Sequence, residues 1–158
     1  MDLSIASYFL HFNLHMMLSS NILITLLLFG ALYTNGQTLS LEQYVWKNRI
    51  IVINNGSSNT LSTDQENLLV KDMSGLNERN LLVFKIDGLK AHELVNGKYF
   101  TVDPQELKSL KLENGVFEVV LIGKDGGIKF RETSLVQSSE IYNIIDQMPM
   151  RKSEMRRQ

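Results

Sequence analysis

Three long apolar runs are the feature that most restricts how this chain can fold. Residues 50–53, 80–86 and 116–122 each hold a nearly continuous series of apolar side chains, many of them β-branched, with little alternation of apolar and polar positions. Such a run is typical of a strand covered on both faces, because a strand with one wet face alternates. A chain with three of these runs needs a sheet with further layers on both sides.

Helical signals lie between and after the runs. Apolar residues at helical spacing between Thr63 and Leu76 predict a helix, with Ser62 or Thr63 as its cap. Asp103 followed by Pro104 predicts the start of a short helix. A final helix is expected from an apolar stripe in residues 138–148, opened by Ser138 or Ser139 and ended by Pro149; the stripe consists of Ile141, Ile144, Ile145 and Met148.

A β-hairpin is expected in the last third of the chain. Residues 123–127 read Gly-Lys-Asp-Gly-Gly, and Asp-Gly between two strands is a strong hairpin signal because its turn needs positive φ. Residues 128–131 alternate apolar and basic side chains, as an outer strand with one wet face does. The order of elements predicts an α/β fold of the thioredoxin-like plan, in which helices flank a central mixed β-sheet and a C-terminal β-hairpin and final helix complete it. We expect this domain to span residues 37–150, followed by a basic tail at 151–158.

The first part of the sequence has the composition of a targeting segment. Asp2 is the only charged residue before Glu42, and residues 22–33 form an apolar run. That run is shorter than the roughly 20 residues of a membrane-spanning helix and matches the hydrophobic region of a signal peptide. We expect residues 1–36 to be a signal peptide that is cleaved between Gly36 and Gln37, with Met16 or Met17 as the true start. Cleavage would leave a periplasmic or secreted protein without a membrane anchor. An uncleaved anchor is the alternative.

Three segments together resemble a known family. Residues 44–49 read Tyr-Val-Trp-Lys-Asn-Arg, residues 121–129 contain the Gly-Lys-Asp-Gly-Gly turn, and residues 145–151 read Ile-Asp-Gln-Met-Pro-Met-Arg, with Glu154 and Met155 beyond them. In these segments the chain resembles the family of domains of unknown function numbered 4174, over residues 41–155. That family is similar to modules of sushi-repeat-containing proteins and of coiled-coil domain-containing protein 80. The resemblance implies a thioredoxin- or peroxiredoxin-like fold and an exported location, and it implies no established reaction.

The chemistry of thioredoxins is excluded by composition. Their reactive cysteine follows the first core strand, where the chain has the loop of residues 54–60, and the sequence contains no cysteine. Serine does not perform thiol–disulfide exchange, and residues 112–116, which precede the third run, lack the proline typical of such sites. With 16 basic and 17 acidic residues, the charge balance gives no reason to expect nucleic acid as a partner. We expect no cofactor and no metal.

A cysteine-independent enzyme is the alternative to a binding protein. Ser57 or Ser58 with His92 and Asp87 could form a catalytic triad near the loop of residues 54–60, and Arg49 could contribute to the same site. A solvated histidine on a loop explains His92 more simply.

The favoured interpretation is an exported, non-catalytic module with a binding or structural role in the cell envelope or extracellular space. Four residues are candidates for contact with a protein partner: Arg131, Met148, Met150 and Arg151. Methionine suits adaptable apolar contacts and arginine suits anionic groups. The last three of these residues could instead dock on the domain itself, and the basic tail could be solvated. The charges of the outer strand could protect an edge from aggregation, or the strand could equally accept a partner strand. The sequence leaves the oligomeric state open.

Overall fold

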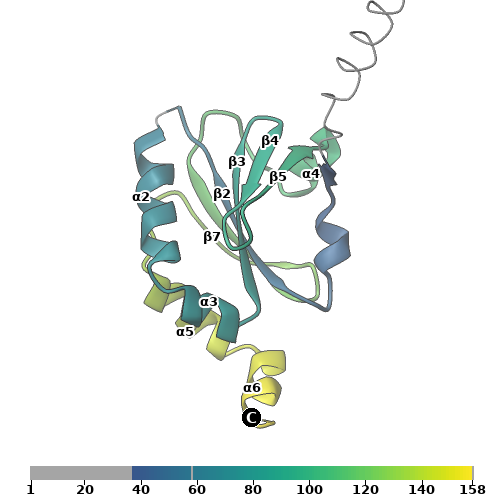
Figure 1. Ribbon diagram of the computed structural model, residues 1–158, viewed down its shortest axis with the longest axis vertical. Coiled ribbons are helices and arrows are strands. Elements are labelled where there is room, and N and C mark those ends of the chain that lie inside the picture. The colour runs from purple at the N-terminus through teal and green to yellow at the C-terminus, as the bar shows by residue number, and fades with distance from the viewer. Residues whose placement is uncertain (1–36, 58, 158) are drawn as a thin grey trace, which may run out of the picture. The chain divides into compact units, whose positions relative to one another are not determined.

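The first apolar run forms β2 (Arg49–Asn54), a strand that is buried along its whole length. In the computed structural model, which describes residues 37–57 and 59–157, β2 lies near the middle of a seven-stranded sheet (Figure 1). The strand order is β1-β5-β4-β3-β2-β6-β7. The expected signal peptide, its cleavage site and the start at Met16 or Met17 lie outside the described residues.

The sheet is mixed, as the sequence predicts. β2 pairs in parallel with β3 (Leu81–Asp87) and antiparallel with β6 (Glu118–Ile122). The expected hairpin joins β6 to β7 (Ile128–Glu132), which is an edge strand. In its turn, Gly126 has φ 78° and its N–H donates to the oxygen of Gly123 at 3.0 Å.

Three further strands extend the sheet on its other side. β4 (Lys90–Glu93) and β5 (Lys98–Val102) form an antiparallel hairpin, and β1 (Gln37–Leu39) pairs in parallel with β5 at the edge. These strands are short and carry exposed polar positions, so they lack the continuous apolar pattern that marks the central strands.

Two apolar layers enclose the central strands, as shown by the alternation along β2. Ile51 and Ile53 pack under α2 (Asn59–Val70), α3 (Met73–Glu78) and α5 (Ser138–Asp146). Ile50 and Val52 pack on the other face, under the 3-10 helix η1 (Leu41–Tyr44) and α4 (Pro104–Ser109). Figure 1 shows these two groups of helices on opposite sides of the sheet.

The predicted cap of α2 is wrong. α2 begins at Asn59, so Ser62 and Thr63 lie inside the helix; Ser62 is fully buried and its hydroxyl donates to the side chain of Asn55. The predicted start of α5 at Ser138 is confirmed, and the hydroxyl of Ser138 donates to the backbone oxygen of Leu68 at 2.9 Å. Ser62 therefore ties α2 to the loop after β2, and Ser138 ties α5 to α2. The cap at Asp103 is confirmed, because its carboxylate accepts the N–H of Gln105.

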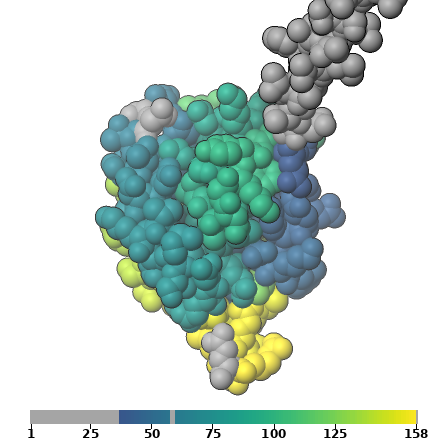
Figure 2. All heavy atoms as spheres, viewed as in Figure 1, coloured from purple at the N-terminus to yellow at the C-terminus, as the bar shows by residue number. Residues whose placement is uncertain are grey.

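The C-terminal segment differs from the expected tail. Pro149 does not simply end the preceding helix; it occupies the first turn of α6 (Pro149–Met155), and Arg151 within α6 is fully buried. A proline is favourable at this position because its missing N–H would be unbonded there anyway. In the space-filling view the yellow C-terminal residues lie against the domain (Figure 2).

Among the described residues, no helix combines the length and the apolar character needed to cross a bilayer.

Candidate functional site

The loop after β2 stands where the thioredoxin plan places its thiol, and here it is fastened to the segment before β6. Gly56 and Gly115 form an isolated parallel bridge. The N–H of Ser57 donates to the oxygen of Gly115 at 2.9 Å, and its hydroxyl donates to the same oxygen at 3.0 Å. The polar groups of Ser57 therefore hold the two segments together.

Asn54 strengthens the same junction. Its side-chain amide donates to the backbone oxygens of Glu113 and Val116, at 2.8 Å each. The two segments also approach closely, because a Cβ added to Gly56 would lie 2.9 Å from the backbone nitrogen of Phe117. At this end of the domain the backbones of the two segments pack together, and the donors of Asn54 and Ser57 are bonded to backbone oxygens.

The proposed triad is not assembled in the described structure. His92 lies on β4, and β3 separates that strand from β2. Its ring stacks on Tyr99, with centroids 4.2 Å apart and ring planes 4° from parallel. Within residues 37–57 and 59–157, no hydrogen bond joins His92 to Ser57 or Asp87; Ser58 lies outside the described residues. His92 therefore lies on a strand and in a ring stack, and not on a solvated loop as predicted.

The three segments that carry the family resemblance meet at the opposite end of β2. The N–H of Trp46 donates to the oxygen of Lys124 at 2.6 Å. Glu154 then accepts from Arg49 at 3.1 Å and from Lys124 at 2.9 Å. We call this end, formed by residues 44–49, 123–127 and 145–155, the motif end. Its members are far apart in the sequence, so only the folded chain brings them together.

A cavity of about 330 Å³ opens at the motif end. It lies between the start of β2, the β6–β7 turn and the link from α5 to α6. Its lining residues are Arg49, Gly123, Lys124, Asp125, Lys129, Met148, Pro149 and Met150. Cationic groups and a methionine–proline wall thus share one cavity, which suits a ligand with an anionic part and an apolar part.

Arg49 is the most deeply placed cation of this cavity. Only 1% of its side chain is exposed, and its guanidinium donates to both carboxylate oxygens of Glu154, at 3.1 and 3.4 Å, and to the backbone oxygen of Arg79 at 2.9 Å. Burial would raise the pKa of Glu154, but hydrogen bonds from Lys124 and Arg49 outweigh it and lower that pKa below its ordinary value. Glu154 is therefore held as a carboxylate.

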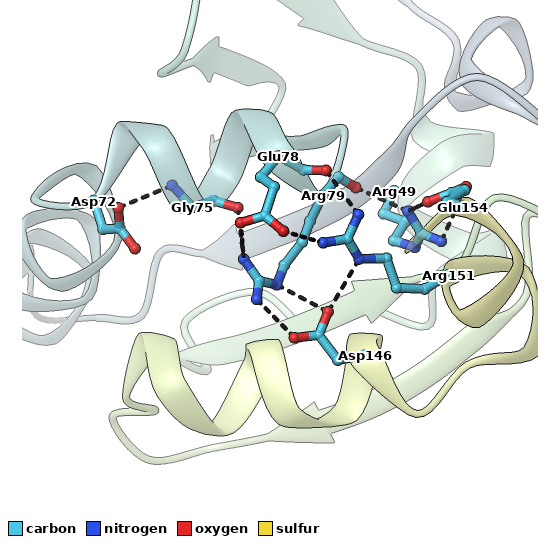
Figure 3. Close-up of polar contacts among 8 residues, drawn as sticks. All are labelled: Arg49, Asp72, Gly75, Glu78, Arg79, Asp146, Arg151 and Glu154. Atoms are coloured by element: carbon cyan, nitrogen blue, oxygen red, sulfur yellow. Dashed lines mark hydrogen bonds and ion pairs between the residues drawn. The ribbon is translucent and has the colours of Figure 1, made fainter. Parts of the chain in front are cut away.

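A second ion-pair network lies beside Arg49 (Figure 3). Arg79 and Arg151 point toward Asp146 from two sides and donate to it at 2.6 and 3.1 Å. Arg151 also donates to the backbone oxygen of Glu78 at 3.0 Å and pairs with the carboxylate of the same residue. Burial would raise the pKa of Asp146, but the hydrogen bonds from both arginines lower it. This network ties α6 to α3 and α5.

Tyr142 completes the packing around Arg79. The guanidinium lies 4.2 Å from the centroid of the tyrosine ring, a distance typical of a cation–π contact. Burial, assisted by the charge of Asp72, raises the pKa of Tyr142 to about 12. Its hydroxyl is therefore neutral and donates to the backbone oxygen of Asp72 at 3.3 Å.

The four candidate residues for partner contact have different positions. Arg151 is buried in the network, so it holds α6 and presents no free guanidinium. Arg131 pairs with Glu118 and donates to the backbone oxygen of Leu110. Met148 and Met150 both line the cavity, and 38% of Met150 is exposed. The structure therefore brings only the two methionines into one possible binding site.

Sequence reasoning missed the cations of the cavity as a group. The sequence places Arg49 in a family segment and suggests it as an addition to a catalytic loop, which lies at the other end of β2. For the outer strand that holds Lys129 it suggests edge protection or pairing with a partner strand. The charge of Arg49 at the start of an apolar run indicates a buried cation cluster, because a buried arginine needs partners. The partners themselves, Lys124 and Glu154, are set by long-range packing.

The described residues contain no group of three or more histidine, cysteine or acidic side chains placed to hold a metal ion.

Comparison with known proteins agrees with this fold. The chain is similar to the reduced 2-Cys peroxiredoxin of Plasmodium vivax, with a TM-score of 0.53 and 15% identity over 73% of this chain and 85% of that one. It is equally similar to thioredoxin peroxidase I of Plasmodium yoelii, with a TM-score of 0.53 and 14% identity over 73% and 80% of the two chains. At these identities the likeness shows the thioredoxin/peroxiredoxin-like fold and nothing of the chemistry.

Sequence comparison adds a relative and a family. The chain is 28% identical over 120 residues to the Sushi repeat-containing protein SRPX of Rattus norvegicus, which covers 73% of this chain and 26% of that protein. It thus spans about a quarter of the length of this relative. The family model described as Domain of unknown function (DUF4174) matches residues 40–154, and the chain belongs to that family.

Proposed function

We propose that this chain is an exported, non-catalytic module that binds a protein partner through its motif end, in the cell envelope or the extracellular space. The observation that carries the proposal is the convergence of the three family segments around one cavity. The loop at the other end of β2 carries no thiol and uses Ser57 and Asn54 to hold the backbone together.

Trp46 supports the choice of this end. Trp46 is 67% exposed, and tryptophan is a residue that protein interfaces favour. Its φ of 65° places it in the left-handed region, which disfavours residues with a side chain. The hydrogen bond to Lys124 holds this strained backbone beside the cavity. Strain of this kind is often stored at functional sites.

Export is supported by the leader-like composition of residues 1–36. Mass spectrometry of the terminal peptide of protein recovered from native cells tests export. The proposal predicts a mature chain that begins at Gln37 and is found outside the cytoplasm. Recovery of chain that retains residues 1–36 in the cytoplasmic fraction would overturn it.

Binding is tested by chemical crosslinking in native cells, followed by purification of the tagged full chain. Wild type is compared with Trp46→Gly, which removes the indole from the motif end, and with Leu89→Ser, which removes an exposed apolar side chain from the β3–β4 turn. We expect one discrete adduct that is retained by Leu89→Ser and lost by Trp46→Gly. An adduct that survives Trp46→Gly, or its absence from the wild type, would contradict binding at this end.

A further inference from the structure

The cavity at the motif end carries an excess of positive charge. Arg49, Lys124 and Lys129 contribute three cations to its lining. Glu154 is shared between the first two, and Asp125 pairs with Lys129 at 2.6 Å. Two carboxylates thus face three cations, which leaves one positive charge without a counter-charge inside the cluster.

The excess is placed where water compensates it poorly. The side chains of Arg49 and Lys124 are only 1% and 10% exposed. In addition, Nε of Arg49 is buried and has no hydrogen-bond partner within the part of the chain that the structure describes. A buried cation without full compensation is unfavourable, so an anion that enters the cavity gains more attraction here than at an exposed lysine.

The apolar wall restricts the kind of anion. Met148, Pro149 and Met150 line the side of the cavity formed by the link from α5 to α6. Methionine side chains adapt to aliphatic groups of varied shape. Near neutral pH inorganic phosphate would bring more than one negative charge and nothing for this wall to contact. A single carboxylate on a short aliphatic chain matches both the excess charge and the wall.

The size of the cavity agrees with a small molecule. Its volume of about 330 Å³ lies at the lower end of the range of roughly 300–1,000 Å³ for ligand pockets. We infer that the cavity binds a free aliphatic monocarboxylate, with the carboxylate among Arg49, Lys124 and Lys129 and the chain against Met148 and Met150. The inference goes beyond partner binding and rests on the proposed function only in placing function at the motif end.

Methionine-methyl NMR of the full chain tests this inference directly. The probes are hexanoate, hexanol and hexylamine, which share an aliphatic chain and differ in head group, together with inorganic phosphate. We expect hexanoate to shift the methyl signals of Met148 and Met150 in a saturable way, while Met73, the first residue of α3, serves as the internal reference. Hexanol, hexylamine and phosphate should shift these two signals at least tenfold less at equal concentration.

Two variants assign the charge recognition. Lys129→Gln and Lys124→Gln each remove one lining cation, and we expect each to raise the Kd for hexanoate about three- to tenfold. Lys98→Gln on β5 is the matched control, because this exposed lysine lies across the sheet from the cavity, and its Kd should equal that of the wild type. Thermal unfolding of each variant establishes that it is folded at the temperature of the titration.

The outcomes separate this inference from the proposed function. Equal binding of hexanol and hexanoate, an unchanged Kd in both cavity variants, or no saturable shift would each overturn the carboxylate site. A discrete crosslinked partner at the motif end would then leave the proposed function standing. If the adduct is absent while hexanoate binds as expected, partner binding fails and the carboxylate site stands.

Discussion

Gly56 shows how a single residue closes the end of the domain where thioredoxins keep their thiol. Its backbone lies against Phe117, and an added Cβ would be 2.9 Å from the nitrogen of that residue. The close approach permits the bridge between Gly56 and Gly115 and the two bonds from Ser57. A side chain at this position would therefore separate the two segments.

The first prediction concerns this contact. Gly56→Ala should lower the free energy of unfolding by about 1–3 kcal/mol, because a backbone atom cannot move away as easily as a side chain. Gly127→Ala is the control: its Cβ would meet neighbours at 3.4 Å or more, so we expect a change within about 0.5 kcal/mol. Urea unfolding of both variants checks the difference. Equal stabilities would show that the segment before β6 moves freely.

The second prediction separates backbone strain from side-chain packing at Trp46. Trp46→Gly should leave the free energy of unfolding unchanged or raise it by up to about 1 kcal/mol, because glycine tolerates φ 65° and the lost indole is largely exposed. Trp46→Ala keeps the strain and loses the indole, so it should be the less stable of the two in the same urea titration. A loss above about 2 kcal/mol in Trp46→Gly would mean that the indole supports the fold.

Among the helices and strands, local sequence signals do not predict the anchoring of α6. The continuous apolar runs predict the central strands, and the Asp-Gly turn predicts the hairpin, because each signal lies within the element it describes. Arg151 instead reaches Glu78 and Asp146, which belong to α3 and α5. A basic residue after a proline has the local pattern of a tail, and only the assembled acids around it make its burial favourable.

In the candidate site, too, local sequence signals predict some residues and miss the contacts that form only between distant segments. Met148 and Met150 were identified because they stand in a specific family segment, and they do line the cavity. Arg49 and Lys124 become neighbours only through the pairing of β2 with β6, which no local pattern encodes. β1, β4 and β5 were missed because their short, partly polar sequences carry too few apolar positions to stand out from loops.

The third prediction tests the anchor. Arg151→Ala should lower the free energy of unfolding by about 2–4 kcal/mol, because it removes the ion pairs of a buried cation. The loss is limited because the two acids stay partly exposed and can be rehydrated. Arg151→Lys should be intermediate, because an ammonium keeps the charge but not the branched geometry. Lys152→Ala, at the exposed neighbouring position, should change it by less than about 0.5 kcal/mol. Thermal unfolding checks all three, and an unaffected Arg151→Ala variant would contradict the anchor.

At the scale of the whole domain, the two ends of β2 have different properties. At one end, backbone bonds between the loop and the segment before β6 hold the chain closed. At the other end, ion pairs of partly buried carboxylates hold α6 and border the cavity. The carboxylates whose pKa values are lowered, Asp125, Asp146 and Glu154, all lie at the motif end, so we expect acid sensitivity of the domain to arise there.

The fourth prediction states this pH dependence. Asp146 and Glu154 have pKa values below their ordinary values of 3.8 and 4.5, so they stabilise the fold above these values and lose that contribution as they are protonated. The free energy of unfolding should therefore fall as the pH drops below about 4.5. Asp146→Asn should be less stable at neutral pH and should show a flatter curve in the acid range. Denaturant titrations at successive pH values check this, and a wild-type stability that is constant down to pH of about 3 would contradict it.

We expect this thioredoxin-like domain to act at its motif end and not at the position of the missing thiol. Photo-crosslinking in native cells tests it most directly, with the same photoreactive amino acid placed in the full chain at Trp46 or at Leu61. Leu61 lies in the first turn of α2 beside the loop after β2 and is 40% exposed, so it reports on the other end. We expect a discrete adduct from position 46 and none from position 61; an adduct from position 61 alone would contradict action at the motif end.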